Sequence, residues 1–237
     1  MPPLVIATET GTIRVTLAHL NDPSAVYSST AKYNTVKSLL RSNYLVLPPS
    51  ASVVGGIAKT DAARGVWKSP ANVALMQVLE PTVSIDNSQQ ESLNVDEVAG
   101  KSINAIRAFV GKGNLIWGAR TLAGNDLEWR YISVRRLFNM VEESLEKATA
   151  FAVFEPNVPF TWLKLKTMTE NYLRNLWQQG ALMGASEGEA FFVHVGLGES
   201  MTPQDILEGL MKIKIGLAAS RPAEFIELTF QHKALEG

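Results

Sequence analysis

The sequence predicts an α/β or α+β fold, a mixed β-sheet flanked by helices, and three observations lead to that class. Two long segments, 131–148 and 159–179, carry apolar residues at helical spacing. Short apolar or alternating runs of strand length lie before, between and after them. The 237 residues are 46% hydrophobic and 19% charged, which is typical of a chain that folds around a sizeable core. Since strands and helices alternate along the chain, both are expected in one packed domain.

The two longer helices are predicted by their ends as well as by their apolar faces. Pro159 suits the first turn of the later segment, and Gly180 suits its end. In the earlier segment, Glu143 stands four residues before Lys147, the order that favours an ion pair on a helix surface. The apolar stripe of the later helix is Trp162, Leu165, Met168, Tyr172, Leu173, Leu176 and Trp177.

Shorter helices are expected at 50–63, 88–98 and 202–209. The first of them contains Gly55-Gly56, which would let another backbone approach closely. The last has a capping hydroxyl at Thr202 and a proline at the first helical position, two signals of a helix start. An acid in its first turn, Asp205, adds a third signal.

Strands are expected in a hairpin across 4–20 and at 44–47, 78–85, 105–110, 115–117, 150–154, 191–195, 213–217 and 224–231. The glycine-rich link 111–113 joins two of them as a turn. It is not a phosphate-binding loop, because it lacks the remaining glycine and the following Ser or Thr of that motif.

The sequence offers no convincing catalytic or metal-binding constellation and no cofactor motif. Of the three histidines, His19 and His194 fall in expected strands and His232 directly follows one. None has a second histidine nearby, whereas a metal or catalytic site needs several groups to converge. The acids Glu142, Glu143 and Glu146 gather on one helix, where a solvated face or an ion-pair interface is favoured over acid–base chemistry. An α/β enzyme with an unrecognised site remains the alternative from another functional class.

Composition excludes several further classes. The absence of cysteine rules out disulfides, thiolate catalysis and cysteine-bound zinc. The net charge of −1 gives little drive for nucleic-acid binding, so no nucleic-acid partner is expected. The start of the sequence has no basic and apolar signal pattern, and no apolar run approaches the roughly 20 residues that span a membrane, so membrane insertion is not expected.

Six phrases, taken together and in order, resemble the C-terminal half of the contractile tail sheath proteins of phages and phage-like injection systems. They are GVWKSPAN (65–72), INAIRAFVGKG (103–113), WGARTL (117–122), WRYISVRRL (129–137), FAVFEPN (151–157) and RPAEFI (221–226). The resemblance implies a structural subunit that polymerises as a helical sleeve around an inner tube and contracts to drive the tube through a target envelope. A type VI secretion-like sheath component, or a baseplate or tube adaptor that does not polymerise, remains an alternative.

The resemblance also implies a division of the chain. It runs from about residue 44 to about residue 232, and sheath proteins of this type are usually much longer. Residues 1–43 are therefore interpreted as the remnant of a preceding domain or arm, 44–220 as the sheath core domain, and 221–237 as a C-terminal linking strand or arm.

The resemblance further implies the surfaces and partners of the subunit. The expected partners are copies of the chain itself, the inner tube protein, and baseplate and tail terminator or cap proteins. Assembly is expected in the bacterial cytoplasm, and the product is a virion tail or a tail-like particle that can be released. The residues expected to donate a strand to a neighbouring subunit are Phe225, Ile226, Leu228 and Phe230. From the residues alone, an internal edge strand of the same subunit is the alternative, and the resemblance favours pairing between subunits. The residues expected on a tube-facing helix with polar contacts are Thr202, Asp205, Glu208, Lys212 and Lys214.

Overall fold

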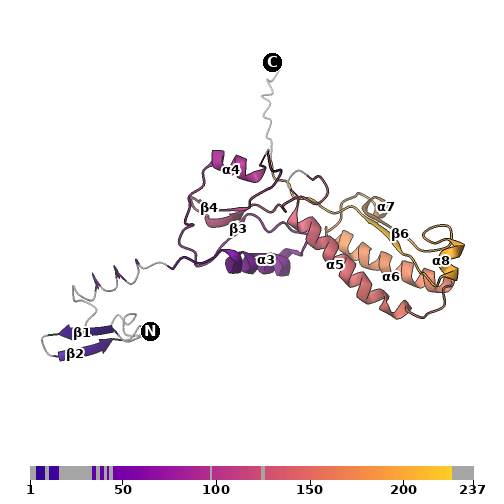
Figure 1. Ribbon diagram of the computed structural model, residues 1–237, viewed down its shortest axis with the longest axis horizontal. Helices are drawn as coiled ribbons and strands as arrows, with labels where there is room; N and C mark the ends of the chain where they lie inside the picture. The colour runs from indigo at the N-terminus through magenta and orange to yellow at the C-terminus, as the bar shows by residue number, and fades with distance from the viewer. Residues whose placement is uncertain are drawn as a thin grey trace, which may run out of the picture. The chain divides into compact units, whose positions relative to one another are not determined.

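The computed structural model describes residues 4–8, 11–15, 34–35, 38–39, 42, 45–96, 98–123 and 126–225. The chain divides into two compact units, Met1–Pro48 and Pro49–Gly237. In the first unit, strand β1 (Leu4–Thr8) pairs antiparallel with β2 (Gly11–Val15) (Figure 1). The predicted hairpin is confirmed over these two strands, and its continuation to residue 20 lies outside the described residues.

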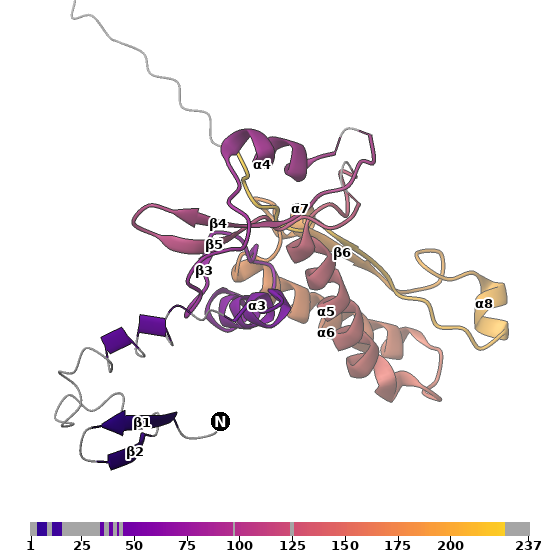
Figure 2. The same cartoon turned by 60° about the vertical axis from the view of Figure 1, so that its left-hand side comes forward.

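The second unit contains a three-stranded antiparallel sheet covered by a helix (Figure 2). Helix α3 (Ser50–Arg64) confirms the helix predicted at 50–63. It packs on the sheet at Gly56. Gly56 is buried, and a Cβ placed on it would lie 2.9 Å from the Cδ1 atom of Ile116. The glycine therefore admits a side chain of the sheet, not another backbone. The strands, in spatial order, are β3 (Val73–Ala74), β5 (Gly113–Trp117) and β4 (Ala105–Phe109).

Helix α4 (Asn87–Asn94) precedes β4 and begins with reciprocal hydrogen bonds. The Asp86 carboxylate accepts from the Gln89 backbone N–H at 2.8 Å, and the Gln89 side chain accepts from the Asp86 backbone N–H at 3.0 Å. The helix ends at Asn94, short of the predicted end at 98, because Val95 already has an extended backbone.

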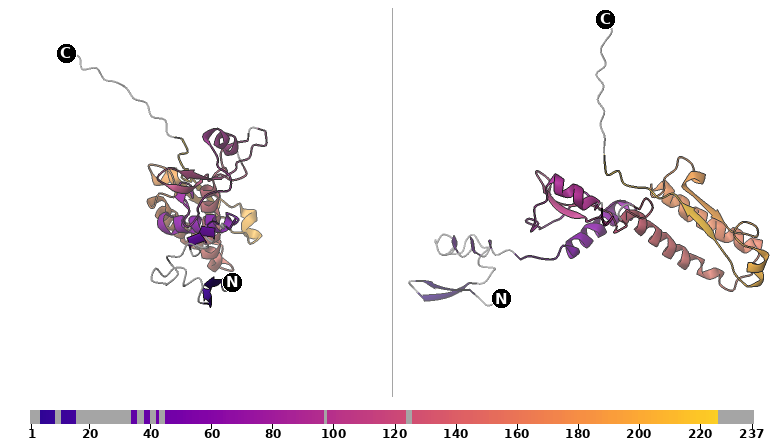
Figure 3. Two further views of the ribbon diagram at one scale, coloured as in Figure 1. Left: turned by 90° about the vertical axis from the view of Figure 1, so that its left-hand side faces the viewer. Right: turned by 45° about the horizontal axis from the view of Figure 1, so that its top comes forward.

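The main core of the second unit lies between two long helices and a two-stranded sheet (Figures 1 and 3). Helices α5 (Ile132–Thr149) and α6 (Pro159–Gln178) match the predicted helices closely. Strand β6 (Phe191–His194) pairs antiparallel with β7 (Lys214–Leu217). This pairing confirms the strands expected at 191–195 and 213–217. The buried core residues are Leu137, Val141, Leu145, Leu173, Leu176, Ala181, Leu182, Ala190, Phe191, Val193, Val195 and Met201.

Two short helices complete the unit. Helix α7 (Glu187–Ala190) precedes β6, and helix α8 (Pro203–Leu207) lies in the connection between β6 and β7. The α+β class, with helices beside sheets, is confirmed. Its strands lie in small antiparallel sheets instead of one mixed sheet, because the β3–β5–β4 sheet and the β6–β7 sheet pack against different helices.

Three predicted strands are wrong. Residues 45–48 and 78–85 have no regular secondary structure, and 150–154 forms a 3-10 turn (η1, Ala150–Ala152) followed by an exposed bend. Each run contains apolar residues, but none of the three pairs with a strand in the part of the chain that the structure describes. The side chain of Phe154 is fully exposed, at 103%, and its φ is +68°. Apolar sequence in these runs therefore marks surface, not core.

Candidate assembly interfaces

The connection between β6 and β7 contains α8, the helix that the resemblance to sheath proteins predicts to face the tube (Figure 2). Thr202 and Asp205 cap it reciprocally: the Thr202 hydroxyl accepts from the Asp205 backbone N–H at 3.2 Å, and the Asp205 carboxylate accepts from the Thr202 backbone N–H at 2.9 Å. The Lys212 ammonium reaches the other oxygen of Asp205 at 2.5 Å. The predicted helix start is confirmed, and the Asp205 carboxylate binds both Thr202 and Lys212.

These contacts change the titration of Asp205. The Lys212 ammonium, followed by the backbone N–H and hydroxyl of Thr202, lowers the pKa of Asp205 from 3.8 to about 2. The carboxylate therefore stays charged throughout the physiological range, and the cap and the ion pair persist together.

Hydrogen bonds fasten this connection to the rest of the unit. The Ser200 hydroxyl donates to the Lys212 carbonyl at 2.6 Å, which closes the base of the connection. The Asn157 amide donates to the Leu210 carbonyl at 3.0 Å, and the Trp162 indole N–H donates to the Asn157 side-chain oxygen at 2.6 Å. The loop that follows α8 is thus tied to the start of α6 through Asn157.

The predicted tube-facing residues do not all lie on the helix. Helix α8 ends at Leu207, so Lys212 belongs to the following loop and Lys214 begins β7, opposite His194. The Glu208 carboxylate accepts from Gln204 at 2.7 Å. The exposed surface is also less polar than expected, because Leu207 is 82% exposed. Contact with a tube remains a prediction for this surface.

The predicted strand-donating residues lie at the end of the described chain. Phe225 is exposed and has no regular secondary structure. Ile226, Leu228 and Phe230 lie outside the described residues, so donation of that strand also remains a prediction.

A partly buried ion pair that sequence reasoning missed holds the chain just before that segment. The Arg120 guanidinium, only 5% exposed, binds the Glu224 carboxylate with two nitrogens, Nε at 2.9 Å and Nη2 at 2.5 Å. The Tyr131 hydroxyl donates to the same carboxylate at 3.2 Å. Asn104 holds Arg120 in turn, because its side chain accepts from the Arg120 N–H at 2.9 Å and donates to the Arg120 carbonyl at 2.8 Å. We call these four residues the Glu224 clamp.

The clamp shifts the titration of its members in opposite directions. Burial by itself would raise the pKa of Glu224, but hydrogen bonds from Arg120 and Tyr131, with the positive charge of Arg120, outweigh burial and lower it. The hydrogen bond to Glu224 raises the pKa of Arg120. Burial, followed by the negative charge of Glu224, raises the pKa of Tyr131. The pair is therefore ionised at neutral pH.

No local pattern could have joined Arg120 to Glu224, which are 104 positions apart. The one signal in the sequence was their occurrence in two of the phrases that carry the resemblance, WGARTL and RPAEFI.

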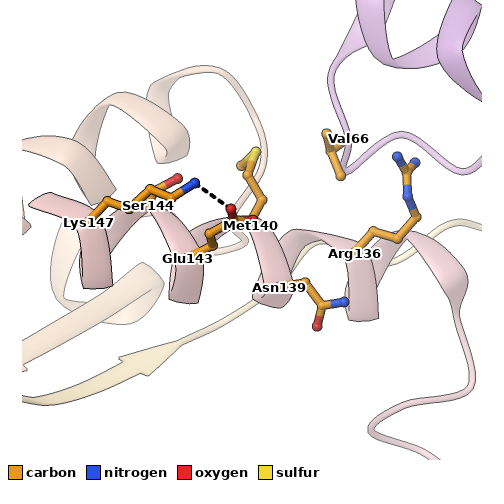
Figure 4. A pocket seen from close by; sticks show the side chains of 7 residues that line it. All are labelled: Val66, Arg136, Asn139, Met140, Glu143, Ser144 and Lys147. Atoms are coloured by element: carbon orange, nitrogen blue, oxygen red, sulfur yellow. Dashed lines mark hydrogen bonds and ion pairs between the residues drawn. The ribbon is translucent and has the colours of Figure 1, made fainter.

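The described part of the chain shows two shallow hollows. One lies between Val66 and the exposed face of α5, where Glu143 and Lys147 form an ion pair at 2.5 Å (Figure 4). The other is lined by Arg64, Trp67, Lys68, Ser69, Gln179, Gly180, Ser220, Arg221 and Pro222. Both hollows include serines, but among the described lining residues no serine hydroxyl is hydrogen-bonded to an acidic or basic side chain.

His194 is the one candidate histidine that lies among the described residues. His194 is half exposed, and its Nδ1 lies 3.7 Å from a carboxylate oxygen of Glu199. His19 and His232 lie outside the described residues. Within the described ranges, no group of three or more His, Asp or Glu side chains is arranged to hold a metal ion.

No helix among the residues described has the length and hydropathy of a membrane span.

Comparison with protein families matches residues 125–233 to the phage tail sheath C-terminal domain. The chain is 29% identical over 144 residues to the tail sheath protein of Enterobacteria phage T4, covering 60% of this chain and 20% of that protein. It is 27% identical over 143 residues to a putative prophage major tail sheath protein of Pseudomonas aeruginosa, covering 57% of this chain and 35% of that protein. The chain thus spans only a minor part of the curated relatives it matches.

Solved structures extend the likeness to most of the chain. The contracted PVC sheath complex of an extracellular contractile injection system matches with a TM-score of 0.75 and 48% identity, covering 80% of this chain and 52% of that chain. The contracted helical sheath of the anti-feeding prophage (AFP) matches with a TM-score of 0.73 and 49% identity over similar fractions. The chain therefore spans about half the length of these sheath proteins.

Proposed function

We propose that this chain, whose residues 125–233 belong to the phage tail sheath C-terminal domain family, is part of a contractile sheath subunit. In this proposal, copies polymerise as a helical sleeve around an inner tube, and shortening of the sleeve drives the tube through a target envelope. The observation that carries it is the likeness of 80% of the chain to helical sheaths, at 48% to 49% identity. The same likeness favours a sheath over an α/β enzyme.

Strand donation is the proposed link between subunits. The segment after Phe225 has the alternation of a strand, and an unpaired strand of that kind needs a partner sheet. The β6–β7 sheet supplies open strand edges, because each strand has one paired neighbour among the described strands. The Glu224 clamp supports the proposal, since it fixes the start of the donated segment while leaving Phe225 exposed. A backbone link of this kind can persist while the bodies of the subunits rotate between two lattice states.

The other partners follow from the same proposal. The sheath would contact an inner tube through α8, a baseplate at one end and a terminator or cap protein at the other. It would be assembled in the bacterial cytoplasm as part of a virion tail or an extracellular injection particle. No enzymatic activity or cofactor is proposed, and a type VI-like sheath remains a variant of the same function.

Electron microscopy of the purified full chain tests the proposal. We expect sleeves or stacked rings with helical or cyclic symmetry, alone or after mixing with the tube protein of the same system. A protein that stays monomeric at all concentrations, with and without the tube protein, would contradict the proposal.

A further inference from the structure

The hollow at the ends of α3 and α6 is lined by cations without acidic partners. Arg64, Lys68 and Arg221 contribute its charges, and we call this surface the basic hollow. Among the described residues none of the three forms an ion pair, and the Lys68 ammonium donates only to the neighbouring Ser69 carbonyl at 3.1 Å. In contrast, Arg120, Arg136 and Arg174 each bind a carboxylate. The basic hollow therefore concentrates positive charge that the described part of the unit does not neutralise.

Its walls also give it the character of a contact surface. Its volume is about 370 Å³, and its lining includes Trp67, which packs partly against the main core. Ser69 is buried beneath it. A tryptophan next to arginines on a partly buried surface is the composition that dominates binding energy at protein interfaces.

The same chain also has an exposed acidic surface, opposite in charge to the basic hollow. Glu142 and Glu146 are both exposed and stand four residues apart on α5, and neither forms an ion pair among the residues described. We call them the acidic pair. Two like charges at this spacing repel each other across one helical turn, so an external cation would stabilise them. The neighbouring Glu143 is different, because Lys147 already neutralises it at 2.5 Å.

We infer that the acidic pair of one copy of this chain docks against the basic hollow of the next copy. The inference deepens the proposed function and rests on it for the self-association of the chain. The two surfaces have opposite charge and differ from each other, so their contact is head-to-tail and leaves one free surface at each end. Head-to-tail contacts that do not close into a ring extend into a helical filament, which is the arrangement that a helical sleeve needs. The charges also set the register in which successive copies meet.

Paired charge reversals test the inference with the full chain. The acid variant carries Glu142→Lys and Glu146→Lys, so both of its surfaces are basic. The base variant carries Arg64→Glu and Arg221→Glu, so both are acidic. We expect each variant alone to lose assembly, with at least a tenfold drop, in order of magnitude, of the sedimenting fraction. Mixing the two should restore assembly, because each then offers the surface that the other lacks.

Matched controls separate this effect from net charge and from misfolding. Glu80→Lys with Glu91→Lys, and Lys101→Glu with Lys112→Glu, make the same charge changes at exposed positions outside both surfaces. These controls should assemble like the original protein. A variant that fails to fold would fail in the mixture too, so restoration by mixing also reports folding. Raising the salt from 0.15 M to 1 M, which shortens the Debye length from about 8 Å to about 3 Å, should weaken assembly.

The outcomes distinguish this inference from the proposed function. If the original protein and both variants all form sleeves, the docking inference is overturned and the sheath function stands. If the original protein forms only short oligomers that the reversals abolish and mixing restores, the docking stands and the sheath function fails. If the original protein is monomeric throughout, both are overturned.

Discussion

Glu224 shows how one side chain can fix the path of a chain end. Its carboxylate is 21% exposed and binds the nearly buried guanidinium of Arg120. Removing only the negative member would leave Arg120 charged and without its carboxylate, and an uncompensated buried charge is costly. The residue therefore matters more for stability than its position near the end of the described chain suggests.

We predict that Glu224→Gln lowers the free energy of unfolding by about 2 kcal/mol at pH 7. Because the pKa of Glu224 is lower in the folded protein than its usual 4.5, its contribution is present above pH 4.5 and is lost as the pH falls through the folded value. Urea unfolding between pH 7 and pH 3 measures both effects. The exposed Glu80→Gln serves as control, and an equal, pH-independent loss in both variants would contradict the clamp.

Asp205 offers a residue-scale test that needs no assembly. We predict that its carboxyl titrates near pH 2 in the folded protein, as followed by NMR of the side-chain carbon. Lys212→Met removes the largest cause of the shift, so the midpoint should move back toward 3.8. Since the folded pKa is depressed, its stabilising effect is present above about pH 4 and disappears as the pH falls through about 2. A midpoint near 3.8 in the unchanged protein would show that the α8 cap does not form.

At the scale of elements, neighbouring glycines in α3 have different roles. A Cβ on Gly55 would meet no atom within 4 Å, whereas a Cβ on Gly56 would lie 2.9 Å from the Cδ1 atom of Ile116. Gly56 therefore sets how closely α3 approaches β5, and Gly55 only weakens the helix.

We predict different effects on stability for two alanine substitutions. Gly55→Ala should raise the free energy of unfolding by roughly 0.5–1 kcal/mol through helix propensity alone. Gly56→Ala should give no gain or a loss of about 1 kcal/mol, because Ile116 must shift within the core. Thermal unfolding of the two variants side by side measures the difference. Equal stabilisation by both would mean that α3 does not pack on the sheet at this point.

The elements that the sequence predicted well are those whose information is local. Helix α6 has a continuous stripe, a proline at its start and a glycine after its end, and its observed bounds agree with the prediction. The hairpin of β4 and β5 was predictable from the glycines around its turn. The false strand at 78–85 has apolar residues too, but Leu79 and Val83 are exposed. An apolar run alone therefore does not say whether its side chains lie in the core or on the surface.

The candidate surfaces were predictable only in part, for a related reason. The α8 cap depends on Thr202 and Asp205, which are three residues apart, so the sequence was enough to find it. The Glu224 clamp joins segments that are distant in sequence, and the basic hollow combines the ends of two helices with the residues near Arg221. Such groupings depend on the tertiary fold, which residue spacing does not reveal.

At the scale of the whole molecule, the proposed linking segment can be separated from the body. We predict that a chain ending at Phe225 folds with unchanged stability but forms no sleeves, since it keeps Glu224 and loses the segment expected to pair with a neighbour. A chain ending at Arg221 should also lose about 2 kcal/mol of stability, because the clamp goes with it. Urea unfolding and electron microscopy of the two truncations check both statements. Normal sleeves from the chain ending at Phe225 would exclude donation by this segment.

The clamp also decides where mechanical force would enter the body. A pull on the C-terminal segment reaches Glu224 first and passes through the two-pronged bond to Arg120. Two hydrogen bonds join the Arg120 backbone to the side chain of Asn104, the residue immediately before β4. Force on Arg120 is therefore transmitted to the three-stranded sheet. Side chains in series would thus carry the load before any backbone hydrogen bond of β6 and β7 is strained. Under tension, the clamp would thus take up load before it reaches the sheet proposed to receive a neighbour's strand.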